Sequence, residues 1–157
     1  MGLKANEHEV IEIGAIRVNR DANEHETFQI LIRLVQPVPD FIAELTGISD
    51  DMLDREGIPL AQAMQDFSAF VGDLPMVAFN AKFDQSFLRQ ASLATGVSFN
   101  NKVSCALVAA RRAWPGRKSY KLVDLSRDGG LNIDDSHRAL GDCHRALVVY
   151  VAACRVV

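Results

Sequence analysis

Cysteine is scarce in this chain of 157 residues, which has only Cys105, Cys143 and Cys154. The number is odd and no pair has C-x-x-C spacing, which argues against a disulfide framework or a zinc site and favours a reducing compartment. No apolar run approaches the roughly 20 residues that span a bilayer. The first nine residues, MGLKANEHE, lack the apolar segment of a signal peptide. We therefore expect a cytoplasmic protein with no membrane partner.

An overall excess of positive charge is also absent, since the net charge is −3. This argues against a protein that coats nucleic acid non-specifically. The charge is unevenly distributed, however. Residues 1–101 carry 7 Lys and Arg against 15 Asp and Glu, whereas residues 102–157 carry 10 against 5. The second part could meet phosphates, although a solvated basic face explains the charge equally well.

The remaining composition, 48% hydrophobic and 24% charged, is ordinary for a globular protein. The length predicts a single domain over residues 1–157. Alternating apolar residues predict two strands over 9–18 and 27–35, joined as a hairpin, and a short buried strand over 75–79. Helical spacing predicts helices from residue 60, from residue 80 to Gly96, and from about His137 to Val156. The order β-β-α-β-α-α-α predicts an α/β or α+β fold with its strands gathered early.

Asp84 follows the predicted strand over 75–79 and stands one turn into the next helix. Ligand sites in α/β proteins commonly lie at this edge of the sheet, so the carboxylate is a candidate functional group. The alternative is an acid that only stabilises the first turn of a helix through the helix dipole.

A second carboxylate, Asp142, opens the last helix in the segment DDSHRALGDCHRALVVY, five residues after His137. Its neighbours Ala139, Leu140, Ala146 and Leu147 are small or apolar, so we expect this helix face to be buried. A buried acid needs a partner, and a metal ion is one candidate. The alternative is a polar helix start capped by Asp134, Asp135 or Ser136.

Two motifs carry a family resemblance. The segment AFNAKFDQSFL resembles the second motif of the DEDDh 3′–5′ exonucleases, and HRALGD resembles their third motif, H-x-A-x-x-D. This family includes the epsilon subunit of bacterial DNA polymerase III, ribonuclease T and oligoribonuclease. The likeness extends to EVIEIGAIRV, LTGISDDML and SYKLVDLSRDGGL, and so covers nearly the whole chain.

The resemblance implies a ribonuclease-H-like fold, a mixed β-sheet flanked by helices. It also implies two Mg²⁺ or Mn²⁺ ions, which in such sites lie roughly 3.5–4 Å apart and stabilise the attacking and leaving oxygens of a phosphodiester. Asp84 and Asp142 would bind metal, and His137 would accept a proton from the attacking water. Asn80 would position the substrate. By the same resemblance, Leu3, Gly47 and Ile48 would line the terminal nucleotide.

The family's first motif, D-x-E-T-x-G, would supply two further carboxylates, but in this chain only MGL aligns with its end. We therefore expect an N-terminally truncated domain that lacks the central strand, leaving a gap between the strands over 9–18 and 75–79. Asp84 and Asp142 alone would hold at most one ion weakly. Glu12 is expected to be an ordinary strand residue and not a substitute ligand.

The segment RRAWPGRKSYK interleaves basic and aromatic residues, as surfaces that bind single strands do. A solvated loop whose aromatic residues pack inward is the alternative.

Two functions follow for the whole chain. The first is a metal-dependent 3′–5′ exonuclease acting on single-stranded DNA or RNA, impaired in this chain, with a DNA polymerase or a homodimer partner. The second is a non-catalytic module that binds nucleic acid or a partner protein.

Overall fold

The computed structural model describes residues 8–156. The predicted hairpin is present as β1 (Glu12–Arg17) and β2 (Glu26–Leu31), which pair antiparallel with Glu12 opposite Leu31. Both strands are shorter than predicted, because their flanking residues belong to turns and loops. β2 alternates between exposed and covered residues and ends in buried Leu31, the pattern expected of a strand with one face on a core.

The second pair of strands is β3 (Met76–Ala78) and β4 (Val103–Cys105), which run parallel. Within residues 8–156, β1–β2 and β3–β4 form two separate two-stranded sheets, joined neither to each other nor into one continuous sheet. An isolated bridge between Ile32 and Ile58 extends the hairpin. Within residues 8–156 β1 and β3 do not pair, and the expected gap left by a missing strand stays a prediction.

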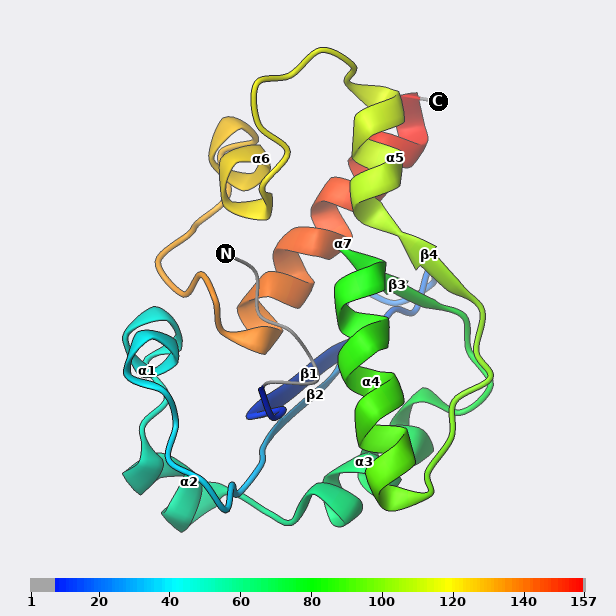
Figure 1. Cartoon of the computed structure of the whole chain (residues 1–157). Helices are drawn as coiled ribbons and strands as arrows, with labels where there is room; N and C mark the ends of the chain where they lie inside the picture. The colour runs from blue at the N-terminus through cyan, green and yellow to red at the C-terminus, as the bar shows by residue number, and fades with distance from the viewer. Residues whose placement is uncertain (1–7, 157) are drawn as a thin grey trace.

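Seven helices surround the strands in the described part of the chain (Figure 1). They are α1 (Asp40–Thr46), α2 (Asp50–Glu56), α3 (Leu60–Val71), α4 (Ala81–Thr95), α5 (Ala106–Ala113), α6 (Leu122–Asp128) and α7 (Ala139–Val156). α7 runs across the middle of the molecule, contacting β1 near its start and α5 further along (Figure 1). Among residues 8–156, no helix combines the length and apolar character that crossing a membrane requires.

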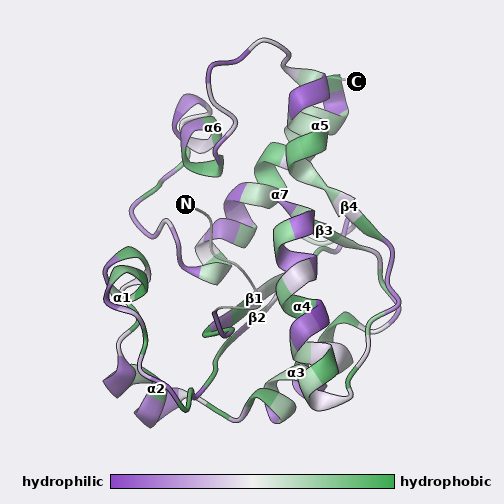
Figure 2. Ribbon diagram, viewed as in Figure 1, coloured by the Kyte–Doolittle hydropathy of each residue, from purple (hydrophilic) through white to green (hydrophobic). Residues whose placement is uncertain are grey.

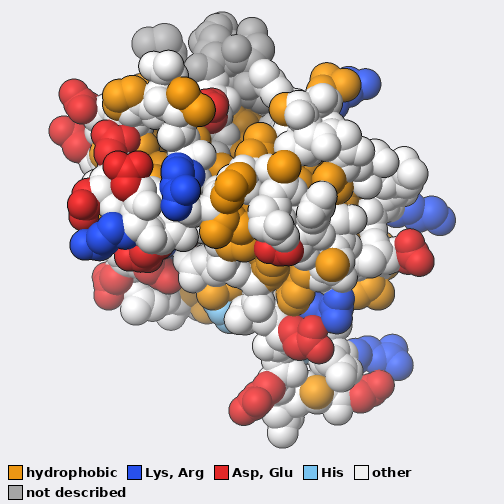
Figure 3. Space-filling model, turned by 90° about the horizontal axis from the view of Figure 1, so that it is seen from below, with side chains coloured by type: hydrophobic (Ala, Val, Ile, Leu, Met, Phe, Trp, Pro, Cys, Tyr) orange, Lys and Arg blue, Asp and Glu red, His pale blue; other side chains and the backbone are white. Residues whose placement is uncertain are grey.

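The apolar residues form two core clusters. One, where the end of β2 meets α1 and α2, contains Leu31, Val38, Ile42, Ile48 and Leu53. The other, where α5 and α6 meet α7, contains Ala110, Leu125 and Val149, with Phe79, Trp114 and Leu122 packed against them. Figure 2 shows the hydrophobic residues concentrated on the hairpin and where α5 meets α7. Figure 3 shows further hydrophobic side chains gathered near the centre of the lower face, with charged side chains towards its rim.

Gly14 allows α7 to approach β1 very closely. A Cβ atom at this position would lie 2.7 Å from the carbonyl carbon of Ala139 and 2.8 Å from the nitrogen of Leu140. The Sγ atom of Cys143 donates a hydrogen bond to the Gly14 carbonyl at 3.2 Å. The backbone contact at Gly14 therefore brings the first turns of α7 directly onto β1.

The structure corrects two predictions about the last helix. α7 begins at Ala139, and His137 lies in the preceding turn with a left-handed φ of 72°. A residue with this φ interrupts a right-handed helix. The buried positions of α7 are Gly141, Arg145, Val149 and Ala153, spaced four apart. The predicted face of Ala139, Leu140, Ala146 and Leu147 is only partly covered.

Candidate active site

Asp84 and Asp142 both occupy the first turn of a helix. Asp84 belongs to α4, which begins directly after β3 with Asn80 as its N-cap residue. The backbone N–H of Asp84 donates to the Asn80 carbonyl at 3.4 Å. Asp142 belongs to α7, which starts where the helix crosses β1 at Gly14. The two acids of the candidate site therefore come from two helices that are far apart in the sequence.

The two carboxylates lie within electrostatic range of each other. Asp84 is exposed, yet partial burial of its carboxyl group raises its pKa from 3.8 to about 6. A hydrogen bond from its own backbone opposes this shift, and the negative charge of Asp142 adds to it. A carboxylate near a second carboxylate holds its proton more tightly. The charge of Asp142 thus acts on Asp84, while the joint role of the two acids as metal ligands stays a prediction.

Cys143 lies among these acids. Burial, together with the charges of Asp84, Asp142 and Glu12, raises the pKa of its thiol to about 12. A protonated thiol is a poor nucleophile and metal ligand. Cys143 therefore serves as packing and as the donor to Gly14.

The Asp142 carboxylate already has protein partners. Its Oδ1 atom accepts a hydrogen bond from Nη2 of Arg145 at 2.7 Å and a longer one, 3.4 Å, from the backbone N–H of His137. The second contact ties the turn that contains His137 to the start of α7. The His137 residue itself is exposed. The structure thus brings His137 and Asp142 together through the backbone of His137, with the imidazole open to solvent.

Glu12 holds the same turn from the opposite side. Its side chain is only 5% exposed and accepts hydrogen bonds from Nη2 of Arg138 at 2.9 Å and from the backbone N–H of Ala139 at 2.8 Å. Gln29 on β2 donates a further bond at 2.8 Å. Burial raises the pKa of Glu12, but these hydrogen bonds and the charge of Arg138 outweigh it and lower the pKa below its ordinary 4.5. The carboxylate of Glu12 is thus occupied by α7 and its preceding turn.

The remaining predicted site residues are less closely grouped. Asn80 is exposed at the N-terminus of α4, and its side chain caps no backbone group of that helix. Gly47 is exposed and ends α1 with a left-handed φ of 71°. Ile48 is 1% exposed and belongs to the core cluster beside β2, so its side chain faces the protein interior. Leu3 lies outside the described residues.

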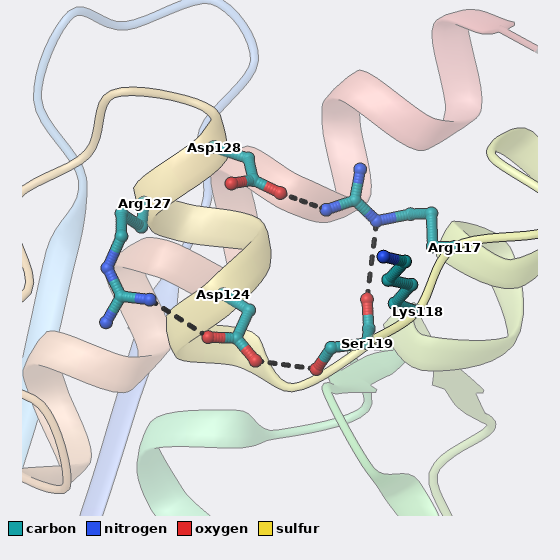
Figure 4. Close-up of a pocket in the computed structure, with 6 residues that line it drawn as sticks. All are labelled: Arg117, Lys118, Ser119, Asp124, Arg127 and Asp128. Atoms are coloured by element: carbon teal, nitrogen blue, oxygen red, sulfur yellow. Dashed lines mark hydrogen bonds and ion pairs between the residues drawn. The ribbon is translucent and has the colours of Figure 1, made fainter.

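The segment after α5 lies against α6, and its Arg117 forms an ion pair with that helix (Figure 4). Arg117 pairs with Asp128, Arg127 pairs with Asp124 at 3.1 Å, and Ser119 donates to Asp124 at 2.6 Å. These residues and the exposed Lys118 line a shallow polar cavity of about 400 Å³.

The two aromatic residues of this segment face inward. Trp114 packs against the core cluster around Val149. The hydroxyl group of Tyr120 donates to the Trp114 carbonyl at 2.6 Å. This agrees with the alternative in which the aromatic side chains pack inward.

Asp84 and Asp142 fit only part of a site for two divalent ions. Their oxygen atoms are the hard donors that Mg²⁺ and Mn²⁺ prefer. Among residues 8–156, however, no group of three or more His, Cys, Asp or Glu side chains is arranged to hold a metal ion. Two ions carry a charge of +4, while these two acids supply at most −2. The described residues therefore do not complete a two-metal site.

Two contacts of this region, Arg145 with Asp142 and Arg138 with Glu12, were not recognised from the sequence. Arg145 stands three residues after Asp142, a spacing at which helical side chains meet, so the sequence did carry a signal for that pair. Glu12 and Arg138 are 126 residues apart, and no local pattern indicates their contact.

Comparison with known proteins shows the family of this chain. Residues 1–150 match the model of the RNase T family, described as exonucleases. The DNA polymerase III epsilon subunit of Treponema pallidum is 32% identical over 152 residues, which cover 95% of this chain and 70% of that protein. The PolC-type DNA polymerase III of Halalkalibacterium halodurans is 34% identical over 143 residues. Those residues are 90% of this chain but only 10% of the polymerase.

Solved structures show the same fold. The nuclease domain of 3′hExo, a DEDDh family member bound to rAMP, superposes with a TM-score of 0.78 at 21% identity, covering 94% of this chain and 82% of that one. Exonuclease X in complex with 5′ overhanging duplex DNA superposes with a TM-score of 0.70 at 21% identity, covering 93% and 82%. The fold is thus the ribonuclease-H-like α/β fold of exonuclease domains. Together with the family match over residues 1–150, this means that the chain belongs to the RNase T-type exonuclease family, that of the DEDDh exonucleases and the DNA polymerase III epsilon subunit.

Proposed function

We propose that this chain is the nuclease part of a 3′–5′ exonuclease that hydrolyses phosphodiester bonds at the 3′ end of single-stranded DNA or RNA. The observation that carries the proposal is that Asp142 binds the backbone of His137 and acts by its charge on Asp84, in a chain of the exonuclease family. The names of its relatives, a polymerase III epsilon subunit and a 3′ exonuclease, support the 3′–5′ direction.

In this proposal His137 is the base that accepts a proton from the attacking water. Its turn is held from two sides, by Asp142 through the His137 backbone N–H and by Glu12 through Arg138 and Ala139. A base held in one position loses less freedom when the substrate binds. The exposure of His137 gives a nucleic acid strand access to it.

Asp84 and Asp142 are proposed as metal ligands that, with the described residues alone, bind at most one Mg²⁺ or Mn²⁺ ion weakly. For the same reason we expect the 157-residue chain to be a much weaker nuclease than its relatives. Asn80 at the N-terminus of α4, the exposed Gly47, and Leu3 remain proposed contacts for the terminal nucleotide. The predicted contact by the Ile48 side chain is not kept, because that side chain is buried in the core. We also propose a polymerase or homodimer partner and a cytoplasmic location; the replicative relatives support the polymerase partner.

The experiment is release of mononucleotides from single-stranded oligonucleotides labelled at the 3′ or the 5′ end, with and without Mn²⁺. Slow, Mn²⁺-dependent release of the 3′ label first is expected, from DNA or RNA. The variant His137→Ala should lose at least about 100-fold in rate, the low end for general base catalysis. His144→Ala, an exposed histidine on α7, is the matched control and should retain full activity. Release that begins at the 5′ end, or is unchanged in His137→Ala, would contradict the proposal.

One observation favours a second function. Arg145 already neutralises Asp142, and the described residues hold no complete metal site. A non-catalytic module that binds nucleic acid or a partner protein is compatible with this arrangement. It predicts strand binding that needs no metal and weakens steeply with salt. Binding that requires Mn²⁺ would argue against this second function.

A further inference from the structure

Arg145 is a charged residue on the buried face of α7. It is 4% exposed and stands four residues from Gly141 and four from Val149, which are also buried. An arginine in such a place needs compensating negative charge, because desolvating its guanidinium group costs free energy. The structure shows which acids provide that charge.

The guanidinium group bridges the turn before α7 and the first turn of the helix. Nη1 donates to the side chain of Asp135 and to the carbonyl of Asn132, the latter at 3.2 Å. Nη2 donates to the Asp135 carbonyl at 3.1 Å and to Oδ1 of Asp142 at 2.7 Å. The Nε atom is buried and has no hydrogen-bond partner among the described residues.

The surrounding structure fixes Arg145 in this position. Gly141 leaves room for the Asp135 side chain, whose Oδ2 atom would lie only 2.2 Å from a Cβ at position 141. Asp135 therefore packs against the helix backbone and holds the far side of the guanidinium group. Asp142 is the partner that faces the candidate active site, and its side chain is 39% exposed.

We propose that Arg145 is a built-in counter-ion of Asp142 that competes with a divalent cation for this carboxylate. This inference rests on the assignment of Asp142 as a metal ligand in the proposed function. A cation that binds Oδ1 of Asp142 meets the guanidinium group on the same oxygen, so the two positive charges repel each other. Metal binding at this oxygen therefore requires Arg145 to move away, and the affinity for such a metal is reduced by the free energy of that movement. Arg145 is thus a positioning residue that sets how readily Asp142 accepts metal.

The test measures Mn²⁺ binding to the whole 157-residue chain, from the electron paramagnetic resonance signal of free Mn²⁺, without nucleic acid. Arg145→Met removes the charge and keeps an apolar side chain for the buried site. It should bind Mn²⁺ about tenfold or more tightly than the original chain, because a unit charge at hydrogen-bond distance is removed. Arg138→Met removes an equal charge from the same turn without touching Asp142, and should not improve binding. Arg145→Lys keeps the positive charge and should still bind Mn²⁺ weakly.

Equal Mn²⁺ affinity in Arg145→Met, Arg138→Met and the original chain would overturn the inference. Because Arg145→Met can weaken the fold, a second measurement uses the unaltered protein with labelled arginine and aspartate side chains. A Mg²⁺ titration followed by NMR should shift the signals of Asp142 and Arg145 together. A shift of Asp142 alone would mean that metal and Arg145 do not compete. Nuclease activity with unchanged Mn²⁺ affinity in Arg145→Met would reject this inference and leave the proposed function standing. Tighter Mn²⁺ binding without nuclease activity would support this inference and reject the proposed function.

Discussion

Glu12 and Arg138 join β1 to the turn before α7 through a forked ion pair. The Nη2 atom of Arg138 lies 2.9 Å from Oε1 of Glu12, and its Nε atom lies 3.2 and 3.3 Å from the two carboxylate oxygens. The backbone N–H of Ala139 adds a bond at 2.8 Å, so Glu12 also satisfies a free N–H group at the start of α7. β1 thereby determines where the His137 turn lies.

Replacing Glu12 by alanine should destabilise the fold. The change leaves the Ala139 N–H and the guanidinium group of Arg138 without their partner. We expect a loss of roughly 2 kcal/mol, below the 3–5 kcal/mol typical of breaking a fully buried pair, because Arg138 is 31% exposed and can reach water. Urea unfolding measures this loss.

The control for Glu12 is Glu26→Ala on β2, which breaks the exposed pair with Arg17. The side chain of Glu26 is 67% exposed, so we expect at most about 1 kcal/mol. Because the pKa of Glu12 is lowered in the folded protein, its stabilisation is present at neutral pH and is lost as the pH falls through that lowered value. Similar losses for both variants would show that the Glu12 pair has no special role.

Gly14→Ala should disturb the junction of β1 and α7. The new methyl group would lie 2.7 Å from the Ala139 carbonyl carbon, which is a backbone atom and cannot rotate away. Overpacking of this kind costs about 1–3 kcal/mol, and thermal unfolding measures it. In the exonuclease assay the variant should also be slower, since α7 carries Asp142.

Gly129→Ala is the matched control for Gly14. The nearest atom to its added methyl group would be the Leu125 carbonyl oxygen, at 3.4 Å, and its φ of −83° suits alanine. We expect a change within about 0.5 kcal/mol. A loss at Gly129 as large as the loss at Gly14 would contradict the assignment of close packing to Gly14.

Asp84 should lose its proton at a higher pH than an ordinary aspartate does. Its pKa of about 6, against an ordinary 3.8, is detectable by NMR of the carboxyl carbon. Because the folded pKa is raised, the folded protein binds this proton more tightly than the unfolded chain does. The contribution of Asp84 to stability is therefore fully present below about pH 3.8 and is lost as the pH rises through about 6. Asp142→Asn removes one of the charges that raise the pKa, so Asp84 should then titrate at a lower pH. An unchanged Asp84 titration in that variant would mean that the two groups are too far apart to interact.

Trp114→Ala should reduce stability more than nucleic acid binding. Trp114 packs against the cluster around Val149, and its carbonyl accepts the Tyr120 hydroxyl. Because Trp114 is only partly buried, we expect about 2–3 kcal/mol, at the low end for truncating a large aromatic residue. Arg112→Ala, an exposed neighbour, should be close to neutral. A variant that unfolds normally but no longer binds single strands would identify Trp114 as a stacking residue.

The sequence by itself predicted most of the helices and strands, because their periodicity and end signals are local. The hairpin, the helix ending at Gly96 and the positions of Asp84 and Asp142 in first turns belong to this class. The start of the last helix was placed two residues early, since the left-handed φ of His137 comes from the turn and not from any periodic pattern.

Only the tertiary structure decided what surrounds the two acids. Glu12 meets Arg138 across 126 residues of sequence, and Arg145 lies on the buried face of α7, where it binds the turn before that helix. Contacts of this kind depend on how complete elements pack, and burial then makes their charge pairing obligatory. The sequence therefore located the acids, and the packing determined which cations they face.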